Sequence, residues 1–191
     1  MRLPTLLVEK RPDQLVNVYL KNENEYDAPL TAFIVGGHTI PRDMTLAIPF
    51  EEGIPAGRIM EVEMGLSAEA ASYMEIYAAV FADGSVTGDP EAVKVILDTR
   101  RKAFEEIPKA IEMLSGESAS IDEFRKWVEA DGEVAWDNAL SILADGSFPV
   151  PLHPVTPWRV IQLLEQGKNA REIVPLLNSL RDRLAQSKPA L

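Results

Sequence analysis

The densest group of chemically useful side chains lies in the stretch VFADGSVTGDP, residues 80–90. No glycine-rich phosphate pattern occurs in it, and Ser85 directly follows Gly84, so it lacks the G-x-S-x-G turn of a serine nucleophile. Only two carboxylates are present, and the glycine comes too early for a calcium loop. We therefore predict a hairpin turn followed by a helix start, although oxygen-bearing side chains do alternate as they would around calcium: Asp83, Ser85, Thr87 and Asp89.

The tetrapeptide ADGS occurs twice, at residues 82–85 and 144–147. The first copy joins two β-like runs, where Asp-Gly is a common hairpin signal because both residues tolerate positive φ. The second copy follows the apolar end of a predicted helix, where glycine ends helices. The repeat therefore indicates two turns of different kinds and not a repeated site.

Other candidates for catalysis are few. The two histidines, His38 and His153, are far apart in sequence, and each lies in a turn-rich segment. The pair Glu51–Glu52 could do acid–base chemistry, but it resembles a solvated loop. The chain has no cysteine, which excludes disulfides, zinc–thiolate sites and cysteine nucleophiles. We predict no catalytic residue, no metal and no cofactor, with a carboxylate-based enzyme or small-ligand site near His38 as the alternative.

Aromatic side chains give a further candidate surface. All three tryptophans lie in the C-terminal half of the chain: Trp127, Trp136 and Trp158. Packing between helices is their ordinary role, and exposed anchors for a protein partner are the alternative.

The segment VIQLLEQGKNAREIVPLL, residues 160–177, resembles the first two helices of helix-turn-helix regulators of the response-regulator type. Residues 156–191 carry six basic and three acidic side chains, a local +3 within a total of −11, so the rest carries −14. DNA binding through this hairpin would use three arginines, Arg171, Arg181 and Arg183. However, the sequence continues as one helix without the break that precedes a recognition helix, so we do not favour nucleic acid as the partner.

The elements that carry these residues change character near Gly88. Before it, short β-rich runs are separated by Pro, Gly, Asn and Asp, and the run QLVNVYLKN alternates in the manner of a strand covered on one side. Five or six short strands are expected, of which SYMEIYAAVFADG (residues 72–84) is the longest candidate. We predict a small antiparallel β-sandwich over residues 1–88.

After Gly88 the apolar period becomes helical, and we predict a helical region over residues 89–191. Asp89 is a suitable N-cap and Pro90 suits the first helical position of a long helix over 90–115. Pro108 should kink or split this helix. Its predicted apolar stripe comprises Val93, Leu97, Phe104, Ile107, Ile111 and Leu114.

Shorter helices are expected beyond it. Ser120 and Glu123 have the spacing of a capping box, and a further helix is expected near residues 135–143. A helical hairpin over 157–187 is predicted, in which Thr156 and Asn169 cap and Gly167 ends the first helix. The stripe of its last helix comprises Ile173, Leu176, Leu177, Leu180 and Leu184.

The composition is that of an ordinary soluble globular protein, with 46% hydrophobic and 26% charged residues in a chain of 191. The net charge of −11 argues against general binding to nucleic acid or anionic membranes. The apolar runs are too short for a membrane span, and we expect no secretory leader at the N-terminus. The protein is therefore expected in the cytoplasm by default, and a mature fragment whose leader is missing is the alternative.

Three consecutive segments resemble uncharacterised bacterial envelope or secreted proteins: the N-terminal segment VNVYLKNENEYDAPLTAFIV, the junction VFADGSVTGDP and the charged helix that follows it. Those proteins carry an immunoglobulin-like β-sandwich that runs through an F-A-D-G-[ST]-x-x-G-D junction into a helix. The resemblance covers roughly residues 10–107 and implies an exported location, which differs from the cytoplasmic expectation. It implies no catalytic residue.

Together these observations predict an α+β protein, an immunoglobulin-like antiparallel sandwich followed by a helical region. The predicted function is that of a non-enzymatic protein-binding or adaptor module, and its partner is not indicated. A homodimer through the stripe of the long helix is an alternative, although Arg100 interrupts that stripe.

Overall fold

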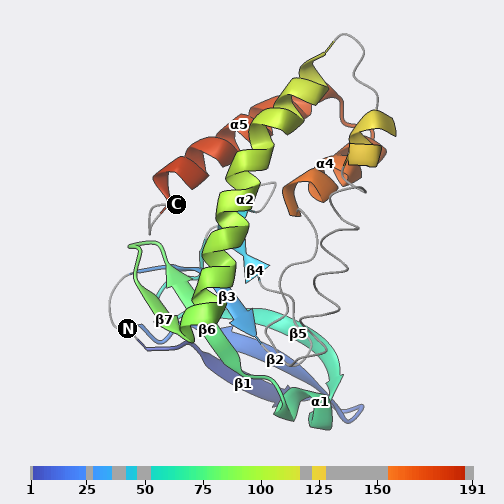
Figure 1. Cartoon of the computed structure of the whole chain (residues 1–191). Coiled ribbons are helices and arrows are strands. Elements are labelled where there is room, and N and C mark those ends of the chain that lie inside the picture. Colours follow the sequence, from blue (N-terminus) through green and yellow to red (C-terminus); the bar gives the residue numbers. More distant parts are fainter. Residues whose placement is uncertain are drawn as a thin grey trace. The chain divides into compact units, whose positions relative to one another are not determined.

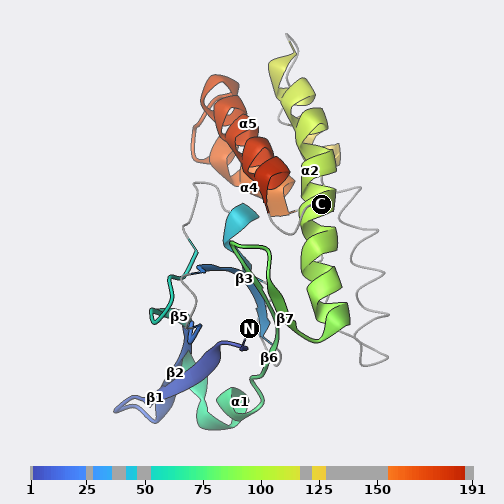
Figure 2. The same ribbon diagram turned by 90° about the vertical axis from the view of Figure 1, so that its left-hand side faces the viewer.

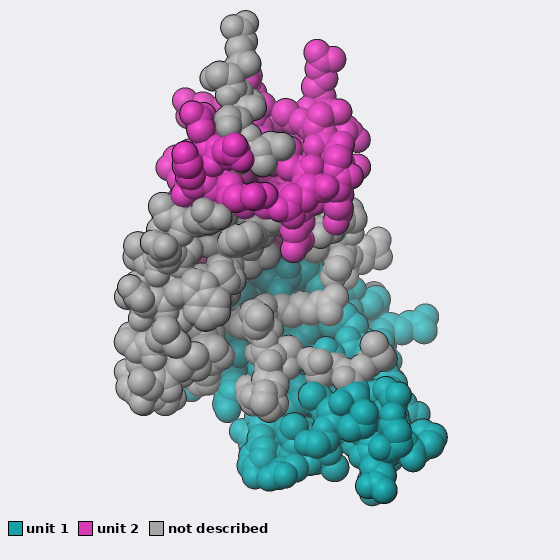
Figure 3. All heavy atoms as spheres, turned by 90° about the vertical axis from the view of Figure 1, so that its right-hand side faces the viewer, with its two compact units in different colours: residues 1–44, 52–96 teal, residues 45–51, 97–191 magenta. Residues whose placement is uncertain are grey.

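The chain divides into two compact units in a computed structural model (Figure 3). Unit 1 comprises Met1–Met44 and Glu52–Ile96, and unit 2 comprises Thr45–Glu51 and Leu97–Leu191. The chain therefore passes between the units three times, at 44/45, at 51/52 and at 96/97. The structure describes residues 2–24, 28–35, 42–46, 53–116, 122–127 and 155–187.

Unit 1 contains two antiparallel sheets (Figures 1 and 2). The first has the strand order β1-β2-β5 and the second has the order β4-β3-β6-β7. The bounds are β1 Thr5–Lys10, β2 Leu15–Lys21, β3 Leu30–Val35, β4 Arg42–Asp43, β5 Ile59–Ser67, β6 Ile76–Phe81 and β7 Val86–Gly88.

Alternation along β2 explains why the sheets pack. Val16, Val18 and Leu20 are buried, while the residues between them are half-buried on the outer face. These three side chains share one hydrophobic cluster with Phe33 of β3 and Phe81 of β6. Burial of this cluster removes apolar surface of both sheets from water, which is the main force holding unit 1 together.

The second sheet is also buried on its other face. The small residues Ala78 and Val80 of β6 are fully buried there, as are Ala32 and Ile34 of β3. The first turns of α2 (Pro90–Ser115), which belong to unit 1, lie beside β6 and β7 in both views (Figures 1 and 2). Ala92, Val93 and Ile96 are the buried side chains of those turns.

The segment expected to form the longest strand is shorter than predicted. Ser67 caps a short helix, α1 (Ala68–Ser72), by accepting a hydrogen bond from Ala70 N–H, and the chain turns at Tyr73 before β6 begins. The longest strand is β5. Seven strands are described, three in one sheet and four in the other, against the five or six expected, and β1 was not among the predicted strands.

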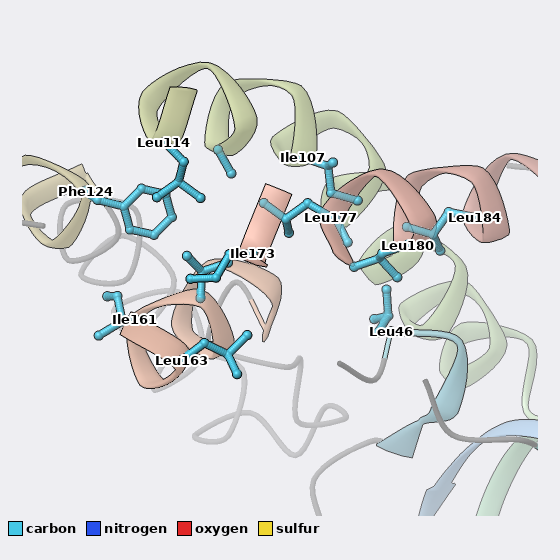
Figure 4. Packing of buried hydrophobic residues seen from close by; sticks show 13 residues of the cluster. Leu46, Ile107, Leu114, Phe124, Ile161, Leu163, Ile173, Leu177, Leu180 and Leu184 are labelled. Carbon is cyan, nitrogen blue, oxygen red and sulfur yellow. The ribbon is translucent and has the colours of Figure 1, made fainter. Parts of the chain in front are cut away.

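Unit 2 is built around a second hydrophobic cluster (Figure 4). Its side chains come from the later turns of α2, from the helical residues 122–127, from α4 (Val155–Glu165) and from α5 (Ala170–Gln186). Leu46, from the 3-10 helix η1 (Met44–Leu46), belongs to the same cluster. Unit 2 therefore needs a segment from the strand-rich half of the sequence.

The long helix is confirmed over Pro90–Ser115, and its predicted buried stripe is confirmed only in part. Of the two outcomes predicted for Pro108, a kink or a split, the split does not occur, since one helix runs through this residue. The buried stripe is also shifted from the prediction, since it uses alanines and one arginine that a search for large apolar residues passes over. The buried residues of α2 are Ala92, Val93, Ile96, Arg100, Ala103, Glu106, Ile107, Ala110 and Leu114.

The C-terminal hairpin is close to the prediction. Gly167 has a φ of 85°, and its N–H donates to Leu164 O while Lys168 N–H donates to Leu163 O, which ends α4 in a Schellman motif. Helix α4 begins at Val155, so Thr156 lies inside it and is not the cap. The stripe of α5 is confirmed, with Leu176 half-buried and the other four residues buried.

Candidate functional site

The junction at residues 80–90 is a turn and a helix cap. Phe81 N–H donates to Ser85 O at 3.0 Å and Gly84 N–H donates to Phe81 O at 3.0 Å, which closes the β6–β7 hairpin. Gly84 has a φ of 90°, whereas Asp83 does not take a positive φ, so the hairpin has a three-residue loop rather than the predicted pair of positive-φ residues. The Asp83 carboxylate accepts from the N–H and the hydroxyl of Ser85 at 2.9 and 2.5 Å.

The second half of the junction starts α2. Asp89 Oδ1 accepts from Glu91 N–H at 2.8 Å and from Ala92 N–H at 3.2 Å, so Asp89 is the predicted N-cap. Gly88 precedes it with a φ of +109°, and a Cβ there would lie 2.1 Å from Tyr77 O. Both aspartates of the junction therefore have structural hydrogen-bonding roles.

Several candidate residues lie outside the described part of the chain. These are His38, His153, Trp136, Ser120 and the pair Glu51–Glu52. The helix expected near 135–143 lies there as well. Within the ranges that the structure does describe, no three His, Cys, Asp or Glu side chains are grouped to hold a metal ion.

Trp127 packs within unit 2. Its ring lies edge-on to Phe124 with the ring centroids 5.3 Å apart, and Lys109 Nζ lies 4.7 Å from its centroid. The side chain is partly buried against the second cluster, which is the packing role expected of a tryptophan between helices. Trp158 lies in α4.

The three arginines proposed for DNA contacts have different surroundings on α5. Arg171 is exposed, and Arg181 pairs with Asp182 at 3.5 Å. Arg183 is half-buried; its guanidinium donates to Thr45 O and to Ser179 Oγ, both at 3.5 Å. Burial lowers the pKa of Arg183 from its ordinary value.

A buried cation was not anticipated from the sequence. Arg100 is only 1% exposed, and its guanidinium donates to Thr45 Oγ1 at 3.0 Å. Arg183 reaches the carbonyl of the same threonine, so two arginines of unit 2 hold Thr45 next to the buried Leu46. These hydrogen bonds link the segment at Thr45 to α2 and α5 within unit 2.

A different surface of unit 1 exposes apolar side chains. Six large hydrophobic side chains are exposed in the part of the chain described, and four of them lie in or next to the β1-β2-β5 sheet: Leu3, Leu7, Val8 and Ile59. Val8 is 53% exposed although its neighbour in register on β2, Val18, is fully buried. Among the described strands, β1 pairs only with β2, and its other side faces no strand in the described ranges.

The hairpin between β1 and β2 sets the direction of this edge. Arg11 N–H donates to Leu15 O at 2.8 Å and Gln14 N–H donates to Arg11 O at 3.3 Å, around a loop in which Gln14 has a φ of 66°. The register continues from Lys10↔Val16 to Thr5↔Lys21 without a shift. We define the β1 edge as the free side of residues Leu6–Lys10.

The sequence contained two signals for this strand. The run TLLVEK is rich in β-forming residues, and Pro12-Asp13 begins a turn after it. The alternation that marks a half-buried strand is absent, because the last four residues of β1 are all exposed.

Comparison of the chain with models of protein families, with curated proteins and with solved structures finds no match. No helix in the described ranges is both long and apolar enough to cross a membrane.

Proposed function

We propose that this chain is a protein-binding or adaptor module and that unit 1 carries the binding surface. The single observation that supports the proposal is the β1 edge, where an outer strand exposes Leu7 and Val8. These two side chains point to opposite faces of the strand, so a partner lying along it would cover apolar surface on both faces. The free strand edge adds backbone groups that can hydrogen-bond with a partner.

The two aspartates of residues 80–90, which were considered as candidates for chemistry, have structural roles that agree with a non-enzymatic function. Asp83 binds the backbone and hydroxyl of Ser85, and Asp89 caps α2. These hydrogen bonds give both carboxylates a structural role, one in a turn and one in a helix cap.

We propose further that the two sheets of unit 1 form an immunoglobulin-like sandwich. Numbering the strands A, B, C, C′, E, F and G along the chain gives one sheet with the order A-B-E and another with the order C′-C-F-G. This partition is similar to that of immunoglobulin-like domains, whose first sheet has a further strand, D, that is not among the described strands. It is compatible with the resemblance to envelope or secreted proteins, although a shared fold does not by itself supply a function.

The test is capture of the tagged full chain from its own cells, followed by mass spectrometry of the co-purified proteins. We expect one stoichiometric partner, which is lost with Leu7→Lys because a charge would be placed in the contact. Val86→Lys is the matched control, since Val86 is a strand residue of unit 1 with 42% exposure that lies away from β1. A chain that purifies alone, or a partner retained by both variants, would contradict the proposal.

A further inference from the structure

We propose that the partner binds as an added β-strand, an extended segment of another protein that pairs antiparallel with the β1 edge. This inference rests on the proposed function, because it specifies how that surface would bind. Strand addition is a recurring mode of recognition in which backbone hydrogen bonds supply affinity and alternate side chains supply selectivity. Three properties of β1 support it: its register with β2, the exposure of its side chains and the charge of its side chains.

The register shows which backbone groups are directed to the edge. In an antiparallel pair, hydrogen-bonded positions alternate with positions whose N–H and C=O point to the other side. Arg11 is hydrogen-bonded to Leu15, and the register of β1 has no shift. The backbone N–H and C=O groups of every second residue before Arg11 therefore also point toward β2. The residues whose N–H and C=O point to the free edge are therefore Leu6, Val8 and Lys10.

Exposure shows that a strand would cover apolar surface there. Successive side chains of a strand point to opposite faces, so Leu6 and Val8 point to the same face as the buried Val18 and Leu20. Leu6 packs against the hydrophobic cluster of unit 1, whereas Val8 remains 53% exposed. A strand added at this edge would cover Val8 and extend that cluster.

A second copy of the chain fits the edge poorly. Three two-fold registers would keep at least two of the edge-facing residues Leu6, Val8 and Lys10 opposite edge-facing residues of the other copy. Centred on Val8, the pairing sets Lys10 against an apolar side chain; centred on Glu9, it sets two like charges opposite each other. Centred on Leu7, it sets Pro4, which has no N–H to donate, opposite Lys10. Two copies would also bring together two chains that each carry a net charge of −11, and these charges repel.

The side chains of β1 specify the chemistry of a partner strand. In the partner strand, apolar residues would lie opposite Leu6, Leu7 and Val8. A basic residue would lie opposite Glu9, and an acidic residue opposite Lys10. Read in the antiparallel direction, this order is acidic-basic-apolar-apolar-apolar. The probe is therefore the acetylated and amidated peptide Ser-Glu-Lys-Val-Leu-Val-Ser.

The test is amide hydrogen exchange of the full chain, followed by NMR with and without this peptide. At ten times its dissociation constant the peptide should slow exchange at Leu6, Val8 and Lys10 by about tenfold. The amides of Leu7 and Glu9, already bonded to β2, should change little. Two control peptides should lose the effect, one N-methylated on the central valine, which removes one backbone donor, and one with Glu and Lys exchanged.

Three results would overturn strand addition. The first is no binding at about 1 mM peptide, the limit of weak specific recognition. The second is equal binding of the N-methylated peptide, since a strand partner needs that donor. The third is protection of the same three amides in the free protein that disappears on dilution, because a second copy would then occupy the edge. If capture finds a partner sensitive to Leu7→Lys while the peptide fails, the proposed function stands and the strand mode fails.

Discussion

At the scale of single residues, the junction between β7 and α2 depends on Gly88. Its positive φ favours glycine, and the close approach of Tyr77 O leaves no room for a side chain. Asp89 N–H then donates to the same carbonyl at 2.7 Å, which ties the start of the helix to β6. One small residue thus allows a strand, a turn and a helix cap to meet within a few residues.

We predict that Gly88→Ala lowers the free energy of unfolding by about 3 kcal/mol, because backbone strain and a steric clash add. Gly57→Ala is the matched control: Gly57 has a φ of +72° but nothing within 4 Å of its would-be Cβ. That control should cost only the strain, about 1 kcal/mol. Urea denaturation measures both, and equal losses would contradict the account of the junction.

Residue patterns gave uneven information about the candidate sites. Asp-Gly and Asp-Pro predicted the hairpin and the cap at residues 80–90 correctly, because both depend on local backbone chemistry. Arg100 could not be recognised as buried, since its hydrogen-bond partner Thr45 lies 55 residues away in sequence. The β1 edge was missed because exposure on both faces removes the periodic signal of a strand.

At the scale of elements, α5 begins with a capping interaction that depends on charge. The Glu172 carboxylate accepts from Asn169 N–H at 3.0 Å. This backbone hydrogen bond, together with Lys168 at 3.6 Å, lowers the pKa of Glu172 from its ordinary value. The carboxylate therefore stabilises the folded chain most when it is ionised.

We predict that this stabilisation is fully present above the ordinary pKa of a glutamate and is lost as the pH falls through the lowered pKa. The difference in stability between the wild type and Glu172→Ala should therefore shrink on acidification. Glu172→Gln is the control, because an amide oxygen can still accept the bond at every pH. Urea denaturation over an acidic pH series measures the difference, and a constant gap would contradict the capping role.

The helices show which structural features can be predicted from the pattern of residues in the sequence. Both ends of α2 agree with the prediction because a cap and a stop are local signals. Its buried stripe was displaced because small alanines and a paired arginine occupy core positions, and only the tertiary neighbours make those positions buried. Helix α1 was not predicted because its five residues are too few to show a periodic pattern.

At the scale of the whole molecule, the two compact units are interleaved along the chain. Residues 45–51 leave unit 1 and belong to unit 2, and α2 begins in one unit and continues in the other. Leu46 is 3% exposed within the cluster formed by the helices of unit 2. The apolar pattern of the sequence changes near Gly88, where the strands end and the long helix begins. The boundaries of the compact units lie elsewhere in the chain.

We predict that Leu46→Ala lowers the free energy of unfolding by about 2–4 kcal/mol, because it leaves a cavity among the buried side chains of unit 2. The control is Leu3→Ala, which should change stability by no more than about 0.5 kcal/mol because Leu3 is 39% exposed. Thermal or urea unfolding, followed by the loss of helical signal, measures both variants. A Leu46→Ala protein as stable as the control would contradict the placement of residues 45–51 in unit 2.

The most direct test of the central claim is amide hydrogen exchange of the full chain, alone and bound to the protein captured with it. In the complex, the amides of Leu6, Val8 and Lys10 should become protected, while that of Val86 should keep its rate. Protection at other segments, with the β1 edge exchanging as fast as in the free chain, would show that partners bind elsewhere and would contradict the account.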